Sequence, residues 1–177
     1  MKLRPLKFLT LLLNWIKRRK STQILPQSFG YSEKIIRSVY SPININKNKG
    51  TLNSNTFRTP PNKDEVSVNR LDYTNANFCK NISKANQSVG QRDYFGFAVI
   101  SKFQIELSNC GIVYTPILKP KEKINIFHSD IKIGYIPERG KELPSEVSKK
   151  INDLTKLARF YIDPNPNSNY WEGNDLT

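Results

Sequence analysis

Residues 125–136, NIFHSDIKIGYI, alternate between apolar and polar side chains over most of their length. A period of two is typical of a β-strand that buries one face and exposes the other. The apolar face of this strand carries Phe127, Ile131, Ile133 and Tyr135, and the polar face carries His128, Asp130 and Lys132. A chain with such a strand must build a sheet, and another layer must cover the apolar face of that sheet.

Four other short segments are rich in β-branched and aromatic residues, which predicts strands at 33–42, 66–73, 94–100 and 112–118. Residues 101–109 fit a short helix and a continued strand equally well. Helical spacing predicts helices at 75–86, with Thr74 as N-cap, and at 146–161, with Ser145 as N-cap. The apolar stripe of the second helix consists of Val147, Ile151, Leu154 and Ala158.

These elements predict a single small α+β domain, with a mixed or mostly antiparallel sheet of about five strands and helices packed on one side. Composition divides the chain into a basic amphipathic N-terminal segment with a linker (1–32), the α+β domain (33–162) and an irregular C-terminal tail (163–177). Tyr170 and Trp171 can fasten the tail to the domain. Residues 43–65 are rich in Asn, Lys, Thr and Pro, which predicts a long surface loop, and such loops are more often functional or mobile than neutral.

The net charge of +13 lies mostly in the N-terminal third of the chain. Residues 1–60 carry 12 lysines and arginines against one acidic residue, whereas residues 61–177 carry 16 against 14. The body of the protein is therefore close to neutral, which argues against polyanion binding by the whole chain. Nucleic-acid binding, if it occurs, is expected through residues 1–60.

Residues 1–20, MKLRPLKFLTLLLNWIKRRK, place a short apolar run between basic ends. The run is far shorter than the roughly 20 residues that span a bilayer, and it continues into KRRK instead of a cleavage site. The segment can dock on the domain, lie on an anionic membrane surface, or form a loose extension. Membrane or partner contact would use Leu9, Leu12, Leu13, Trp15 and Ile16. We expect a cytoplasmic protein, with peripheral contact at the inner face of the membrane as an alternative.

Cys79 and Cys110 are too few for a disulfide framework, and with only one histidine in the chain they are also too few for a structural zinc site. We expect both thiols to be reduced and partly buried. The sequence contains no Gly-rich phosphate loop, zinc-site spacing, GxSxG elbow or kinase motif. It therefore predicts no metal ion and no small-molecule cofactor.

His128 and Asp130 project from one strand face with Cα atoms about 6.6 Å apart, two residues of strand rise. Asp130 would favour the imidazolium form of His128, and Lys132 would oppose it. Such a face can carry out general acid/base chemistry, with an arginine or lysine steadying a phosphate. Polar strand faces carry the same residue types routinely, and that structural role is the more frequent one.

Arg70 and Arg37 both lie inside predicted strands. Each can pair with a carboxylate such as Asp130 or hold an anionic ligand bidentately, and the structural ion pair is the commoner case. The catalytic hypothesis therefore combines His128, Asp130 and Arg70, with Arg37 and Lys132 as anion-binding residues.

The segments RSVYSPINI, KGTL, DEVSVNRL and FHSDIKIGYIP together resemble a group of small bacterial proteins with no established activity. That group shares a Ser-Val-(Asn/Asp)-Arg segment, here residues 67–70. It also shares a late Asn-Pro-x-His-Ala-(Asp/Glu)-Ile strand, here residues 125–131. Ile126 and Ser129 stand where the pattern has proline and alanine.

The resemblance covers about residues 35–160 and implies a bacterial, cytoplasmic setting. It also draws Arg70, His128 and Asp130 together as one site, without supplying a mechanism.

Three functions remain open from the sequence. The first is a small bacterial accessory or interaction domain that acts with a partner protein, for example in a defence or toxin operon. The second is a small metal-independent hydrolase or ribonuclease-like effector that uses His128, Asp130 and Arg70, so whether the protein is an enzyme stays undecided. The third is nucleic-acid binding through the basic N-terminal third.

Overall fold

The computed structural model describes residues 25–46, 49–87, 92–120 and 124–177. The elements in chain order are β1 (Lys34–Ser41), β2 (Ile45–Asn46), β3 (Thr51–Leu52), η1 (Ser54–Thr56), β4 (Glu65–Arg70), η2 (Leu71–Tyr73), α2 (Ala76–Gln87), β5 (Asp93–Ser101), α3 (Lys102–Leu107), β6 (Gly111–Tyr114), β7 (His128–Lys132), α4 (Ser145–Leu157) and β8 (Arg159–Ile162). The predicted contact residues of the N-terminal segment lie outside the described ranges: Leu9, Leu12, Leu13, Trp15 and Ile16.

Six strands form the main sheet, in the spatial order β6-β7-β4-β1-β5-β8. Every neighbouring pair in this sheet is antiparallel. The predicted α+β class with a mostly antiparallel sheet is therefore confirmed, with six strands in the main sheet where about five were expected.

The sixth strand, β8, arises from residues that the helical pattern assigned to the end of the last helix. The helix α4 ends at Leu157, and Ala158 already has an extended backbone with ψ of 131°. Phe160 and its neighbours Arg159, Tyr161 and Ile162 then pair with β5. Aromatic and β-branched residues favour a pleated, half-buried surface. Pairing with β5 therefore places residues 159–161 in a strand, although the apolar spacing had predicted that the helix continues to Tyr161.

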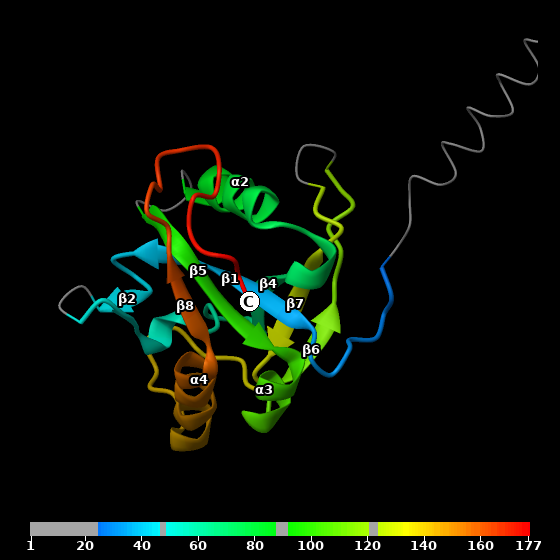
Figure 1. The fold of residues 1–177 in the computed structure, drawn as a ribbon. Helices are drawn as coiled ribbons and strands as arrows, with labels where there is room; N and C mark the ends of the chain where they lie inside the picture. Colours follow the sequence, from blue (N-terminus) through cyan, green and yellow to red (C-terminus); the bar gives the residue numbers. More distant parts are fainter. Residues whose placement is uncertain (1–24, 47–48, 88–91, 121–123) are drawn as a thin grey trace, which may run out of the picture.

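Helices cover both faces of the sheet, as Figure 1 shows, and not one face as predicted. The reason lies in the central strands β1 and β5, whose consecutive residues are apolar and buried on both sides. Ile35 belongs to a core that includes Ile151 and Leu154 of α4, and Ile36 belongs to a second core that includes Cys79 of α2. In an antiparallel sheet with two apolar faces, each face needs its own covering layer.

The described parts of the segment 43–65, residues 43–46 and 49–65, contain more regular structure than their composition predicts. It contains the hairpin of β2 and β3 and the short helix η1, and Phe57 is fully buried in the core beneath α4. Asn44 is also buried, and its side chain accepts a hydrogen bond from the backbone N–H of Tyr40 at 3.0 Å. Polar residues therefore hold this loop together through main-chain contacts, which composition alone does not reveal.

Local capping differs in detail from the sequence prediction. Ser101 caps α3 with a full capping box, which decides between the helix and strand alternatives for residues 101–109. At α2 the side chain of Asn75, and not that of Thr74, accepts the backbone N–H of Phe78 at 2.9 Å. Ser145 is the first residue of α4 and not its side-chain cap.

Among the described residues, no helix is long and apolar enough to cross a membrane.

Candidate functional site

The structure brings His128 and Asp130 together with two hydroxyl groups from neighbouring strands. Ser67 of β4 lies opposite Asp130 in the sheet, and Thr115 follows the end of β6. Thr115 Oγ1 donates to Asp130 Oδ2 at 2.6 Å, and Ser67 Oγ donates to Asp130 Oδ1 at 3.4 Å. We call these four residues, Ser67, Thr115, His128 and Asp130, the β7 polar cluster.

The orientation of the His128 ring follows from its contacts with Thr115. Nδ1 lies 2.8 Å from the carbonyl oxygen of Thr115 and 3.1 Å from its Oγ1. A carbonyl can only accept a hydrogen bond, so Nδ1 carries a proton and Nε2 is the nitrogen that can exchange one. Nε2 lies 3.9 Å from Asp130 Oδ1, and the two side chains are 14% and 9% exposed. The Asp130 carboxylate is therefore the acidic group beside Nε2 but lies beyond direct hydrogen-bond distance, and the site offers little access for a substrate.

Lys132 lies on the same face but is bound to another partner. Its Nζ lies 2.7 Å from Glu65 Oε1 on the neighbouring strand. This hydrogen bond is the main cause that lowers the pKa of Glu65 and raises the pKa of Lys132. The Lys132 ammonium is therefore already neutralised by Glu65, which weakens its predicted role in anion binding.

Arg70 does not join the β7 polar cluster, so this part of the sequence hypothesis is corrected. Asn69 pairs with His128, and the next residue, Arg70, projects from the opposite face of the sheet. Its side chain is fully buried and forms a two-point ion pair with Glu33, with Nε–Oε1 at 2.5 Å and Nη2–Oε2 at 2.8 Å. The guanidinium also donates to the carbonyl of Ser28 at 2.9 Å and to that of Pro26.

Three aromatic rings enclose the Arg70 guanidinium: Phe29, Tyr73 and Tyr114, with distances of 4.1 to 5.4 Å from Cζ to the ring centroids. A buried arginine whose charge is paired and whose donors meet carbonyls is a structural anchor. Arg70 fixes the segment that precedes β1 to the sheet.

Arg37 fills the gap where β1 and β4 separate. The two strands pair only at Ile35 and Ile36, and beyond them Arg37 reaches across. Its Nη1 donates to the main-chain carbonyl of Ser67 at 2.6 Å, and its Nε donates to that of Thr56 at 3.0 Å. Burial lowers the pKa of Arg37 to about 10. The first hydrogen bond bridges β1 and β4 where they do not pair, and the second ties β1 to η1, so protein carbonyls occupy these donors in place of the predicted anion.

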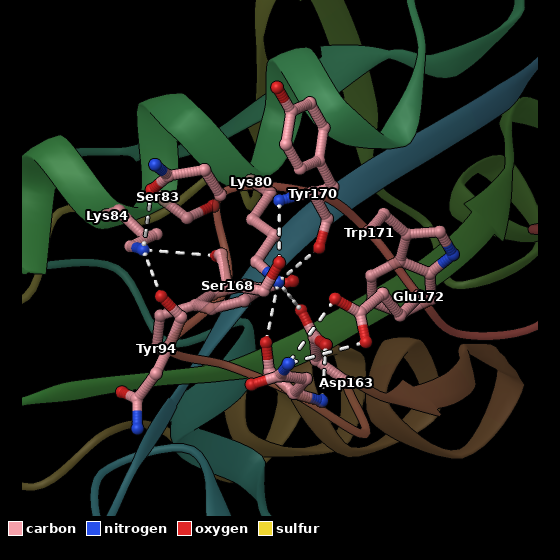
Figure 2. A network of polar contacts seen from close by, with 12 residues as sticks. Lys80, Ser83, Lys84, Tyr94, Asp163, Ser168, Tyr170, Trp171 and Glu172 are labelled. Atoms are coloured by element: carbon pink, nitrogen blue, oxygen red, sulfur yellow. Dashed lines mark hydrogen bonds and ion pairs between the residues drawn. The ribbon is translucent and has the colours of Figure 1, made fainter.

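A second polar network, which the sequence did not reveal, fastens the C-terminal tail to α2 (Figure 2). Lys80 is fully buried, and its Nζ lies 2.8 Å from Asp163 Oδ2. The same ammonium donates to the carbonyls of Asn165 at 2.8 Å and Tyr170 at 2.7 Å. One helical turn later, Lys84 donates to three oxygens of the tail, at residues 167–169.

This arrangement makes the tail an integral part of the domain. The Trp171 ring packs on Phe97 with centroids 5.2 Å apart, as the sequence suggested for the tail aromatics, whereas Tyr170 is exposed. Burial and the nearby Asp163 carboxylate raise the pKa of Tyr94 far above its ordinary value. The sequence carries no local signal for the burial of Lys80, because its partner Asp163 lies 83 residues later in the chain.

The strand β8 is an edge of the sheet and borders a groove. The groove has a volume of about 480 Å³ and is lined by Gly50, Thr51, Leu52, Thr155, Lys156, Ala158, Phe160 and Ile162. Its walls are therefore the β2–β3 hairpin, the end of α4 and β8. Ile162 is 49% exposed although it is apolar. No strand in the described part of the chain pairs with the outer side of β8.

The two cysteines are free, and both are buried where the sequence predicted partial burial. Burial raises the pKa of Cys79 to about 12 and that of Cys110 to about 11. Neither thiol is therefore a ready nucleophile near neutral pH. The described residues contain no group of three His, Cys, Asp or Glu side chains that could hold a metal ion.

Comparison with protein-family models, with curated proteins and with solved structures finds no match to this chain.

Proposed function

We propose that this domain acts with a partner protein that docks on the edge strand β8 and the groove beside it. The observation that carries the proposal is an unpaired, apolar sheet edge next to a groove of about 480 Å³. We assign this role to the cytoplasm of a bacterium, in the setting of an accessory protein from a defence or toxin operon.

Exposed sheet edges offer unpaired N–H and C=O groups to other chains, and proteins usually protect them with charges, prolines, bulges or a covering segment. On one face of β8 the carbonyl of Thr177 accepts hydrogen bonds from the side chains of Arg159 and Tyr161, whereas the face that borders the groove has little protection. Its sequence is Arg-Phe-Tyr-Ile, and the single charge, Arg159, stacks on the ring of Tyr161 at 5.0 Å. An edge that is open, apolar and flanked by a groove fits the addition of a partner segment.

The contacts of the candidate catalytic residues support an enzyme less well than the β8 edge supports docking of a partner. Arg70, Arg37 and Lys132 are all bound to protein groups, and none of them points a free charge at His128. The hydroxyl groups of the β7 polar cluster are directed at Asp130. Nucleic-acid binding through residues 1–60 would depend largely on the segment that precedes the described residues.

The full-length protein, tagged and produced in the cells from which it comes, tests the proposal. Ile162→Lys places a charge on the β8 edge, and Val113→Lys places one on the opposite edge strand β6, at a residue of similar exposure (49% and 46%). We expect one partner protein to co-purify with wild type and with Val113→Lys but not with Ile162→Lys. Recovery of the same partner with Ile162→Lys, or of no partner with any form, would contradict the proposal.

Proton transfer at His128 is a second candidate, favoured by the 3.9 Å approach of its Nε2 to Asp130. An enzyme predicts that His128→Ala leaves the melting temperature nearly unchanged but abolishes RNA cleavage or toxicity on expression. A structural histidine predicts a lowered melting temperature and no activity to lose.

A further inference from the structure

The geometry points to the chemistry of the partner segment: an extended, acidic stretch that alternates apolar and acidic side chains and adds to β8 as an antiparallel strand. This inference rests on the proposed function and specifies what the β8 edge recognises. Three features carry it: the direction of the free main-chain groups, the apolar groove and the charges around it.

The register between β5 and β8 determines which main-chain groups are free. Asp163 N–H donates to Phe95 C=O at 3.0 Å, so these two residues form a hydrogen-bonded antiparallel pair. Hydrogen-bonded and non-hydrogen-bonded pairs alternate along such a ladder. Phe160 and Ile162, which oppose Ala98 and Gly96, therefore direct their N–H and C=O groups away from β5. Two donors and two acceptors thus face outward along β8.

The side chains of the same two residues line the groove. In an antiparallel ladder, directly opposed residues project from the same face of the sheet. The partner residues that bond to Phe160 and Ile162 would therefore place their own side chains in the groove, against Leu52 and Ala158. These positions of the partner are best filled by aliphatic side chains, spaced two residues apart.

The charges around the edge favour an acidic partner. Lys156 is exposed at the lip of the groove, and Arg159 is exposed on the opposite face of β8, where its guanidinium also donates to the carbonyl of Thr177 at 3.4 Å. No acidic residue lines the groove, and the nearby Asp163 is buried in its pair with Lys80. The residues between the two apolar positions would face the Arg159 side, so acidic residues suit them.

A second copy of the chain is a less suitable occupant of the edge. A second β8 strand, Arg-Phe-Tyr-Ile, would bring Arg159 and no acidic side chain to the edge, so it does not complement the charges there. We expect the partner segment to run antiparallel to β8, because every strand pair in the main sheet is antiparallel.

Binding of synthetic peptides to the full-length protein tests the inference. The probe is an acetylated and amidated heptapeptide, Glu-Val-Glu-Val-Glu-Val-Glu, and the readout is its dissociation constant by fluorescence anisotropy. An analogue with lysine in place of glutamate tests the charge. Analogues N-methylated either at the valines or at the glutamates test the main-chain bonds, because methylation removes the N–H donor.

We expect the acidic peptide to bind wild type and Val113→Lys, and to lose at least about fivefold in affinity on Ile162→Lys. Methylation of the valines should cost about fivefold or more, because these residues bond to β8 in the antiparallel register. Methylation of the glutamates should change the affinity by less than about twofold. The lysine analogue should bind more weakly, and added salt should weaken the acidic peptide alone.

Equal binding of the acidic and lysine peptides, or equal effects of the two methylations, would overturn the inference. So would self-association of wild type that Ile162→Lys abolishes in sedimentation, because a second copy would then occupy β8. Loss of the co-purified partner on Ile162→Lys, together with failed peptide binding, would leave the docking function standing and reject the partner chemistry. A partner that binds regardless of Ile162 would reject the function itself.

Discussion

Replacement of Lys80 by methionine should loosen the C-terminal tail and destabilise the whole domain. The Lys80 ammonium is fully buried and contacts Asp163 and the carbonyls of Asn165 and Tyr170, all within 2.8 Å. Lys80→Met keeps most of the side-chain volume but leaves the Asp163 carboxylate buried without its counter-charge. The two carbonyls lose their donor at the same time.

Removal of one partner from a buried ion pair costs about 3–5 kcal/mol. For a domain of this size, about 1 kcal/mol corresponds to a change of about 2–4 °C in the melting temperature, so we expect a fall of roughly 10 °C. Lys84→Met is the matched control, because Lys84 lies one turn away and holds the same tail without a carboxylate partner. We expect it to cost about 1 kcal/mol.

Thermal unfolding and urea titration measure these differences, and hydrogen exchange at residues 165–171 reports the local effect. The double variant Lys80→Met, Asp163→Asn removes both charges and should recover part of the loss. Two results would contradict this reasoning: Lys80→Met no more destabilising than Lys84→Met, or unchanged exchange rates in the tail. Either would mean that the contacts of Lys80 with the tail do not stabilise the domain.

Three other perturbations follow from the geometry. Gly96→Ala would bring a Cβ atom to 2.2 Å from the carbonyl oxygen of Tyr161, so we expect it to displace β8 and abolish peptide binding, which anisotropy and hydrogen exchange can follow. Arg37→Met removes the hydrogen bonds from Arg37 to the carbonyls of Ser67 and Thr56 and should lower the free energy of unfolding by about 3 kcal/mol, measured by urea titration. Cys79 and Cys110, with pKa values raised to about 12 and 11, should react with a thiol reagent at pH 8 only after denaturation, and rapid labelling of the native protein would contradict their burial.

The class of the fold could be predicted because each strand carries its own local pattern. The alternation in 125–136 correctly placed Ile131 and Ile133 in the core and His128 and Asp130 on the other face. The strand β8 could not be found in this way, because the apolar period of α4 continues without a glycine or proline to mark its end. Its conversion to a strand depends on pairing with β5, which is distant in sequence.

The candidate site was predictable only where it lies on one strand. His128 and Asp130 share a face by the period of two, but Thr115 and Ser67 reach them through the registers of other strands. The prediction that Arg70 joins His128 and Asp130 was wrong because it followed the resemblance. Arg70 lies three residues after Ser67 on β4, so its side chain points to the other face of the sheet. The pairing of Lys80 with a tail residue 83 positions later has no local signal at all.

Photo-crosslinking in the cells from which the protein comes tests docking at β8 most directly. p-Benzoylphenylalanine is placed at position 162 on β8 or at position 113 on β6, and the adducts are identified by mass spectrometry. We expect a single discrete adduct from position 162, with the crosslink in an extended acidic segment of the partner, and none from position 113. An adduct that forms equally from both positions, or only from position 113, would contradict docking at β8.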